Sequence, residues 1–456
     1  MSPRLSFFLD LTESLVSPKH LFGLSITSTC EETITAAIDA LAIPHLATLR
    51  VFSLSLKYPE YANYKESRSF LRTCGTHSFQ RLHRISYLRP LFQDLEDVPK
   101  LCSFTLSSNW PEASQMLGVT IDTPEFPCHQ LTHIDIRNLR TVGLHHIEEI
   151  LARCPSAEKF FARVSSDYSR PTERGCDLFL PRLHEVRLYG KMPSEIRTTQ
   201  IPWSQLRILY VGRMRRHHFF TILRQCEALE KFTSGLFAYE EDSDEELEDA
   251  NVTDILLPQL TSLSIKFMIR SAPLKNHILD VLILPSLVTL EVYSMYDSKK
   301  RPFPLSQIST MIAQSGDQLQ SIRLNSDTLG YDMKGLFGVL TRVPSVSVFQ
   351  TNFSLKEDVL QDIGHGALLP HLEEIHCLTA SLRGFRDLVR ERVRQEEASV
   401  GQAVLRKAVG WVETLYVDAD NDVSDLMSEM HAMREEKGRN FAYRFHSGHS
   451  ASSIRL

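Results

Sequence analysis

A six-residue apolar pattern, L-x-x-L-x-L, recurs from near the first residue to residue 417 and constrains this chain more than any other feature. In one copy, Leu290 and Val292 point to one face of an extended strand, while Thr289 and Glu291 point to the other. With modest substitutions, the copies start at Leu21, Leu46, Leu82, Leu101, Leu131, Ala157, Leu183, Leu206, Leu229, Leu260, Leu287, Leu319, Val343, Leu372 and Val412. About fifteen strands at a quasi-regular spacing predict a repeat protein rather than several globular domains.

The intervals between these strands carry apolar residues at helical spacing. Offsets of three, four and seven residues give a single apolar stripe in the interval before Leu229: Phe219, Ile222, Leu223 and Cys226. Ser306 and Asp358 are predicted N-caps of two other helices. Each unit therefore reads strand, loop, helix, turn, and its halves bury their apolar faces only by stacking on neighbouring units. We predict an α/β solenoid with a curved parallel β-sheet on the concave side, helices on the convex side and about 15 irregular repeats.

This single solenoid is expected to extend over residues 1–456, with three atypical segments. Residues 238–254 are predicted to form an acidic disordered loop, because Glu240–Asp249 holds eight acids and no base. That run outweighs the net charge of −6, so the rest of the chain is slightly basic. Residues 380–440 are predicted to form a helical C-terminal cap region around the last repeat, and residues 441–456 a flexible tail.

Two junctions and four strand starts carry a family resemblance. Ile150-Leu-Ala-Arg-Cys154-Pro and Ile222-Leu-Arg-Gln-Cys226-Glu resemble the helix-to-strand junctions of F-box leucine-rich-repeat proteins. Strand starts of the form L-P-x-L, at Leu180, Leu257, Leu284 and Leu369, are similar to the fungal, basidiomycete-style group of such proteins with degenerate repeats. The resemblance implies a leucine-rich-repeat fold and substrate recognition for a cullin-type ubiquitin ligase. The helical F-box segment that binds the ligase adaptor is not found in this sequence, so that partner is expected only if an F-box lies upstream.

In such a solenoid, the residues between the core leucines line the concave face. We predict that this face binds a partner, since tyrosine and arginine often dominate binding energy. The predicted partner-binding residues are His133, Asp135, Arg137, Glu185, Arg187, Tyr189, Tyr210, Arg213, Lys266, Glu291, Tyr293 and Arg323, and Thr48, Arg50 and Asn325 point the same way. A solvated strand face is the alternative reading, because any such face must be polar. Arg213 also belongs to a basic cluster, Arg213–His218, which could grip an acidic segment or pair with Glu240–Asp249.

Two groups of residues have the side-chain types of metal ligands, but ordinary structural roles are favoured for both. Cys128, His129, His133, His145 and His146 match no zinc-finger spacing. Asp418, Asp420, Asp422 and Glu429 copy the carboxylate spacing of a calcium loop, but Val423 stands where that loop needs glycine.

The sequence favours binding over catalysis. It contains no G-x-S-x-G, H-E-x-x-H or phosphate-binding glycine motif, so we expect neither an enzyme nor a cofactor. It has no apolar run long enough to span a membrane, and its eight cysteines are scattered, which indicates an intracellular protein of the cytoplasm or nucleus. We expect a monomer that binds protein partners, with no role for nucleic acid or membrane. Its function is then substrate recognition related to F-box proteins, or that of a free-standing scaffold.

Overall fold

The computed structural model describes residues 23–28, 51–56, 103–108, 128–137, 144–164, 178–191, 201–214, 216–238, 254–269, 278–296, 303–315, 317–326, 332–379, 381–398, 403–413 and 422–446. The chain divides into two compact units, Met1–Arg213 and Met214–Leu456. Each unit contains a parallel β-sheet in which the strands follow one another in chain order.

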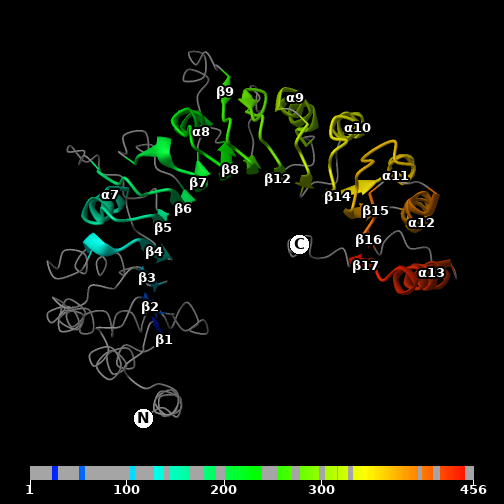
Figure 1. Ribbon diagram of the computed structural model, residues 1–456, viewed down its shortest axis with the longest axis horizontal. Coiled ribbons are helices and arrows are strands. Elements are labelled where there is room, and N and C mark those ends of the chain that lie inside the picture. Colours follow the sequence, from blue (N-terminus) through cyan, green and yellow to red (C-terminus); the bar gives the residue numbers. More distant parts are fainter. Residues whose placement is uncertain are drawn as a thin grey trace, which may run out of the picture. The chain divides into compact units, whose positions relative to one another are not determined.

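Unit 1 carries the first seven strands and the first helix of the described residues. Its elements are β1 (Gly23–Ser28), β2 (Val51–Leu56), β3 (Ser103–Ser108), η6 (Cys128–Gln130), β4 (His133–Arg137), α7 (Leu144–Arg153), β5 (Lys159–Val164), β6 (Glu185–Lys191), η9 (Trp203–Gln205) and β7 (Ile208–Met214). Every strand pairs in parallel with the next, from β1 to β7. Figure 1 shows α7 on one side of this sheet.

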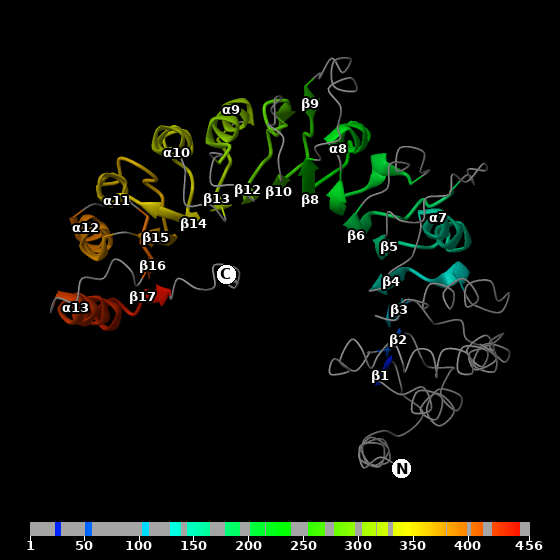
Figure 2. The ribbon, with the colours of Figure 1, turned by 180° about the vertical axis from the view of Figure 1, so that it is seen from behind.

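Unit 2 repeats the arrangement with more helices. Its elements are α8 (Arg216–Leu223), β8 (Lys231–Ala238), β9 (Ile255–Leu256), β10 (Ser262–Ile269), β11 (Leu282–Ile283), β12 (Thr289–Tyr296), α9 (Leu305–Ser315), β13 (Ser321–Ser326), α10 (Met333–Leu340), β14 (Val348–Leu355), α11 (Glu357–Gly364), β15 (Glu374–Thr379), α12 (Leu382–Ala398), β16 (Lys407–Glu413), α13 (Asp422–Lys437) and β17 (Asn440–His446). The sheet order is β8-β10-β12-β13-β14-β15-β16-β17, and β9 pairs separately with β11. Its helices lie along one side of the sheet, as both views show (Figure 1, Figure 2).

The core of each unit lies between the sheet and its helices, because alternate strand residues face the helices. In β12 the helix-facing residues Leu290 and Val292 are fully buried, and the same alternation runs through β13 and β14. Phe219 of α8 packs on Phe232 of β8, with ring centroids 5.6 Å apart. The α/β leucine-rich-repeat solenoid predicted from the sequence is confirmed, and fifteen strands of this kind occur in the described residues.

A four-residue turn with a hydrogen bond from its fourth N–H to its first carbonyl leads into the strands. In the L-P-x-L starts, the amides of Leu183, Leu260, Leu287 and Leu372 donate to the carbonyls of Leu180, Leu257, Leu284 and Leu369. Proline suits the second position of such a turn, because its φ is fixed near the required value and no N–H is needed there. Cys154–Ala157, Cys226–Leu229 and Val343–Val346 form the same turn directly after a helix.

This turn corrects one predicted strand register, and two other copies also differ. Val343-Pro-Ser-Val346 is the turn itself, so the strand pattern begins at Val346 rather than Val343, and Phe349 is the first buried residue of β14. The copy predicted to start at Val412 is formed seven residues earlier, with Leu405 and Ala408 buried ahead of and within β16. β2 starts at Val51, where the strand predicted from Leu46 ends. The copy at Leu82 lies outside the described residues.

The three atypical segments can be compared with the structure only in part. Residues 239–253 of the acidic segment lie outside the described residues. α12, β16 and α13 fall within residues 380–440. β17 spans Asn440–His446 and pairs with β16, so the flexible tail predicted from residue 441 is wrong for its first six residues. The sequence missed this strand because Phe441-x-Tyr443-x-Phe445 lacks the leucines of the repeat pattern.

The predicted N-caps are also corrected. α9 begins at Leu305 and α11 at Glu357, so Ser306 and Asp358 lie inside the first turns. The cap with the clearest geometry is Asp332, whose carboxylate accepts hydrogen bonds from the amides of Lys334 (3.0 Å) and Gly335 (3.1 Å) at the start of α10.

Replacing this cap with alanine should destabilise α10. Asp332→Ala removes the acceptor for two amides that have no partner within the helix, which costs about 1 kcal/mol. Lys356→Ala is the matched control, because Lys356 occupies the N-cap of α11 and makes no side-chain capping bond. Hydrogen exchange of the α10 amides should be faster in Asp332→Ala, and an equal effect on α11 in Lys356→Ala would contradict the capping role.

Candidate functional site

The strand residues that alternate with the core form the open face of each sheet, the face opposite the helices. Most residues predicted to bind a partner lie on it: His133, Asp135, Glu185, Arg187, Tyr189 and Tyr210 in unit 1, and Lys266, Glu291, Tyr293 and Arg323 in unit 2. Arg213 is exposed at the end of β7, beyond an irregularity in the pairing of β6 with β7. Arg137 ends β4 with its side chain outside the described residues, where Thr48 and Arg50 also lie.

In unit 1, the predicted residues gather around an aromatic residue that was not predicted, Phe161 of β5. Phe161 stands between Asp135 and Arg187 in the sheet register and is 7% exposed. The Arg187 guanidinium lies over its ring at 4.9 Å, and the His133 ring meets it edge-on at 5.0 Å. Together with Glu185, Tyr189 and Tyr210, these residues form what we call the Phe161 cluster. The signal in the sequence was Phe160-Phe161, in which only the first residue belongs to the repeat core.

Glu185 fixes the position of Arg187. The Nε of Arg187 donates to Glu185 Oε1 at 2.7 Å, and Nη2 lies 2.6 Å from the same oxygen. Lys159 Nζ approaches the other carboxylate oxygen at 3.4 Å. Burial acts to lower the pKa of Arg187, but the hydrogen bond and charge of Glu185, with a contribution from Tyr189, raise it overall. Arg187 is therefore a permanent cation held in one orientation.

Tyr189 and Tyr210 stack beside this guanidinium. Their ring centroids are 4.6 Å apart and their planes meet at 39°. Burial raises the pKa of Tyr210, and the neighbouring Tyr189 adds to the shift, so the Tyr210 hydroxyl is neutral near pH 7. The pairing of β6 with β7 shifts register between Leu188 and Lys191, where Gly190 has φ +98°. Such irregularities often redirect side chains at binding sites, and this one adjoins the tyrosine pair.

In unit 2, one row of the open face is a polar ladder across four adjacent strands. Ser264, Glu291, Arg323 and Gln350 face one another in the register of β10, β12, β13 and β14. Ser264 Oγ donates to Glu291 at 3.2 Å, and Arg323 Nη1 lies 3.0 Å from Glu291 Oε1. Arg323 also donates to Gln350 Oε1 at 2.7 Å and to the Tyr293 hydroxyl at 3.3 Å. The predicted residues Glu291, Tyr293 and Arg323 are thus brought into contact.

Two further residues of this face were missed because the β14 register was predicted three residues early. Gln350 closes the ladder, and Asn352 bonds both main-chain groups of Ser326, accepting at 2.7 Å and donating at 2.6 Å. These bonds fix the end of β13 beside Asn325.

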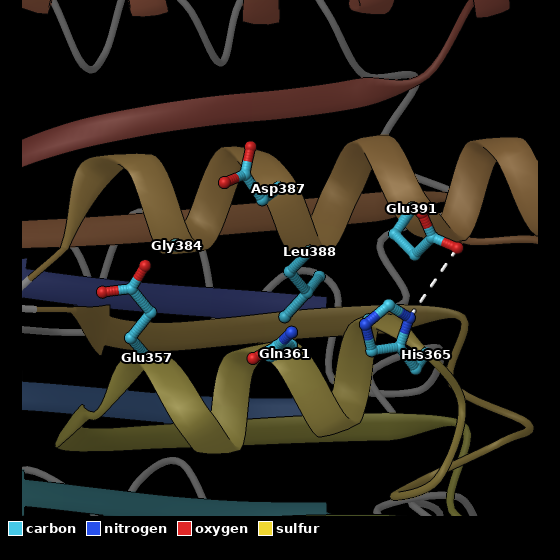
Figure 3. A pocket seen from close by; sticks show the side chains of 8 residues that line it. Glu357, Gln361, His365, Gly384, Asp387, Leu388 and Glu391 are labelled. Atoms are coloured by element: carbon cyan, nitrogen blue, oxygen red, sulfur yellow. Dashed lines mark ion pairs between the residues drawn. The ribbon is translucent and has the colours of Figure 1, made fainter.

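A groove between α11 and α12 lies on the helix side of unit 2 (Figure 3). α11 and its last turn contribute Glu357, Gln361 and His365, and α12 contributes Asp387 and Glu391. His365 Nδ1 lies 3.7 Å from Glu391 Oε1 and pairs with it when the imidazole is protonated. The helices approach closely because Gly364 has no side chain: a Cβ there would lie 3.2 Å from the Leu388 Cα.

Most residues of the two candidate metal sites considered from the sequence lie outside the described residues, or their side chains do. The side chains of His145 and His146 and the residues Asp418 and Asp420 lie outside the described residues. Among the residues that are described, no group of three or more His, Cys, Asp and Glu side chains is placed to hold a metal ion. Cys154, Cys226 and Cys377 are buried and form no disulfide, and burial raises the pKa of Cys226 to about 12 and that of Cys377 further. Cys226 and Cys377 are therefore not reactive thiolates near neutral pH.

No protein-family model and no curated protein matches the sequence. Within the described residues, no helix has the length and apolar content needed to cross a membrane. A chain from the crystal structure of the Rad7 and Elc1 complex in yeast is similar, with a TM-score of 0.39, 13% sequence identity and 82% of each chain covered.

Proposed function

We propose that this protein binds other proteins through the open faces of its two sheets. The observation that carries the proposal is the Phe161 cluster, in which an arginine and two tyrosines are held by neighbouring side chains. Arginine and tyrosine dominate the energy of many protein interfaces. Side chains already fixed in the free protein lose little conformational entropy on binding, which leaves more of the contact energy for affinity.

The polar ladder of unit 2 supports partner binding through the open face of the second sheet as well. Its four side chains satisfy one another across β10, β12, β13 and β14, so they present a defined pattern of donors and acceptors. A row of this kind favours partners with complementary polar groups and disfavours others.

We infer that the setting is substrate recognition related to the F-box proteins of ubiquitin ligases. The helix-to-strand junctions at Cys154 and Cys226 support this through their resemblance to that family. If an F-box lies upstream, affinity capture of the tagged chain extended to include it should recover a cullin adaptor together with other partners. Recovery of partners without any adaptor would instead favour a free-standing scaffold.

Site-specific photocrosslinking tests the open face directly. A photoreactive phenylalanine in place of Tyr210 or Tyr293 should crosslink partner proteins in cells. The same group in place of Phe337, which is 44% exposed on α10 at the helix side, is the matched control. Crosslinks from position 337 alone, or equal patterns from all three positions, would contradict binding through the open face.

A further inference from the structure

We propose that the Phe161 cluster recognises an acidic segment of a partner protein, with an aromatic side chain of that segment on Tyr189 and Tyr210. This inference rests on the proposed function and specifies the chemistry of the partner. It depends on three properties of the unit 1 open face: which charges are exposed, how Arg187 is held, and what lies beside it.

Among the described residues of unit 1, the exposed charges on this face are positive. The carboxylates of Asp135 and Glu185 are 4% and 3% exposed. The side chains of Lys159 and Arg187 are 42% and 41% exposed. Arg163 of β5, which lies opposite Tyr189 in the sheet register, is also exposed. The buried carboxylates are therefore shielded from a partner, whereas the exposed cations are accessible to it. Charge complementarity favours an acidic segment and disfavours a basic one.

Arg187 is built to accept a carboxylate. A guanidinium offers five N–H donors in a rigid fork, of which Glu185 takes two and the Tyr189 hydroxyl takes one. Glu185 and the Phe161 ring hold the guanidinium plane, so an incoming carboxylate meets donors that are already oriented. The exposed part of the side chain leaves room for this second anion beside the buried one.

Tyr189 and Tyr210 favour a partner segment that also carries an aromatic side chain. Tyr189 interacts with Arg187, and its ring packs against that of Tyr210 at an angle of 39°, so an aromatic surface begins next to the cation. A segment that places a carboxylate on Arg187 can set a neighbouring aromatic ring against the two phenols. Acidic residues flanking an aromatic residue satisfy both contacts.

The ladder of unit 2 contrasts with this site and provides a control. Arg323 is paired with Glu291, and the two side chains are about equally exposed, at 29% and 27%. Arg323 also donates to Gln350 and Tyr293, and because Glu291 is as exposed as Arg323, the pair presents balanced charges on this face. A preference for acidic segments is expected of the Phe161 cluster and not of the ladder.

The test measures fluorescence anisotropy of labelled peptides with the full chain. The peptides have about ten residues, long enough to cross two strands spaced about 4.8 Å apart. One combines glutamates with a central tryptophan, a second replaces glutamate with lysine, a third replaces tryptophan with alanine, and a thymidine oligonucleotide probes nucleic acid. At ~50 mM salt, where screening is weak, the glutamate–tryptophan peptide should bind best. The lysine peptide should bind at least about tenfold more weakly, and the alanine peptide about two- to tenfold more weakly.

Variants assign the binding to the cluster. Arg187→Gln should weaken binding of the glutamate–tryptophan peptide by at least about tenfold, whereas Arg323→Gln should leave it unchanged. Tyr210→Ala should weaken that peptide and not the alanine peptide. Thermal unfolding of each variant separates a lost contact from a lost fold.

The possible outcomes separate this inference from the proposed function. Equal binding of glutamate and lysine peptides, an equal effect of Arg187→Gln and Arg323→Gln, or tighter binding of the oligonucleotide overturns the acidic-segment proposal. Crosslinks from positions 210 and 293 with no peptide preference would leave partner binding standing and remove only its acidic specificity. Absence of both results would overturn the two proposals together.

Discussion

Arg392→Ala is expected to loosen the C-terminal part of unit 2 more than any substitution of an exposed charge. Arg392 lies in α12, is 3% exposed and donates to four main-chain carbonyls, one in α11 and three in the connection from α11 to β15. The acceptors are Ile363 (2.8 Å), Leu368 (3.2 Å), Leu369 (2.6 Å) and Pro370 (3.1 Å). Burial lowers the pKa of Arg392 to about 10, so the side chain remains charged at neutral pH.

The connection that Arg392 holds is a strained one. Leu369 has φ +49°, in the left-handed region that residues with a side chain rarely adopt, and it begins the turn into β15. Alanine at position 392 would leave the carbonyls of Leu368 and Pro370 without a donor in the described contacts, while those of Ile363 and Leu369 would keep the amides of Gly366 and Leu372. The strained turn would also lose its support. Charge-assisted hydrogen bonds and the desolvation of orphaned groups put the cost at about 3–5 kcal/mol.

Hydrogen exchange of the β15 amides measures this effect as a lower free energy of local opening. Arg394→Ala is the matched control two residues along the same helix, because Arg394 is 74% exposed and pairs only with Glu391 in the described contacts. It should change the opening free energy by less than about 0.5 kcal/mol. Arg392→Lys should fall between the two, since an ammonium has three donors and no planar fork. Equal effects of Arg392→Ala and Arg394→Ala would contradict the anchoring role.

Gly212→Ala should disrupt the pairing of β6 with β7. A Cβ at Gly212 would lie 2.3 Å from the carbonyl oxygen and 2.6 Å from the nitrogen of Gly190. Both atoms belong to the main chain, so the strands must move apart instead of a side chain rotating away. We expect a loss of about 3 kcal/mol or more, at the upper end of overpacking effects.

The same substitution at another glycine should act in the opposite direction. At Gly338 in α10, a Cβ would meet side-chain atoms of Arg342 and Ser309 at 3.7 Å, which is ordinary contact. Gly338→Ala should therefore stabilise the helix by about 0.5–1 kcal/mol. Thermal unfolding of both variants checks the pair, and a neutral Gly212→Ala would show that the two strands tolerate separation. Because Gly212 adjoins Tyr210, this variant should also weaken binding to the Phe161 cluster.

Much of the architecture follows from the sequence alone. Apolar residues at a spacing of two, followed by apolar residues at helical spacing, predicted strands and helices in alternation, and the structure confirms that fold. Errors arose where the pattern was ambiguous: Val343, Val346 and Val348 fit the repeat, but Val343 belongs to a turn. β17 was missed because its aromatic residues fit no leucine pattern.

Alternation also predicted which strand residues face away from the helices, since neighbouring side chains on a strand point to opposite faces. It did not predict which of them meet, because contacts across a sheet depend on the register between segments 26 to 32 residues apart. Arg187 over Phe161, the stacked Tyr189 and Tyr210, and the ladder from Ser264 to Gln350 exist only once that register is fixed. For the same reason Arg392 was one of several arginines in a charged helix until tertiary packing buried it against four carbonyls. The sequence determined the repeat and its two faces, and the tertiary structure decided which side chains on those faces act together.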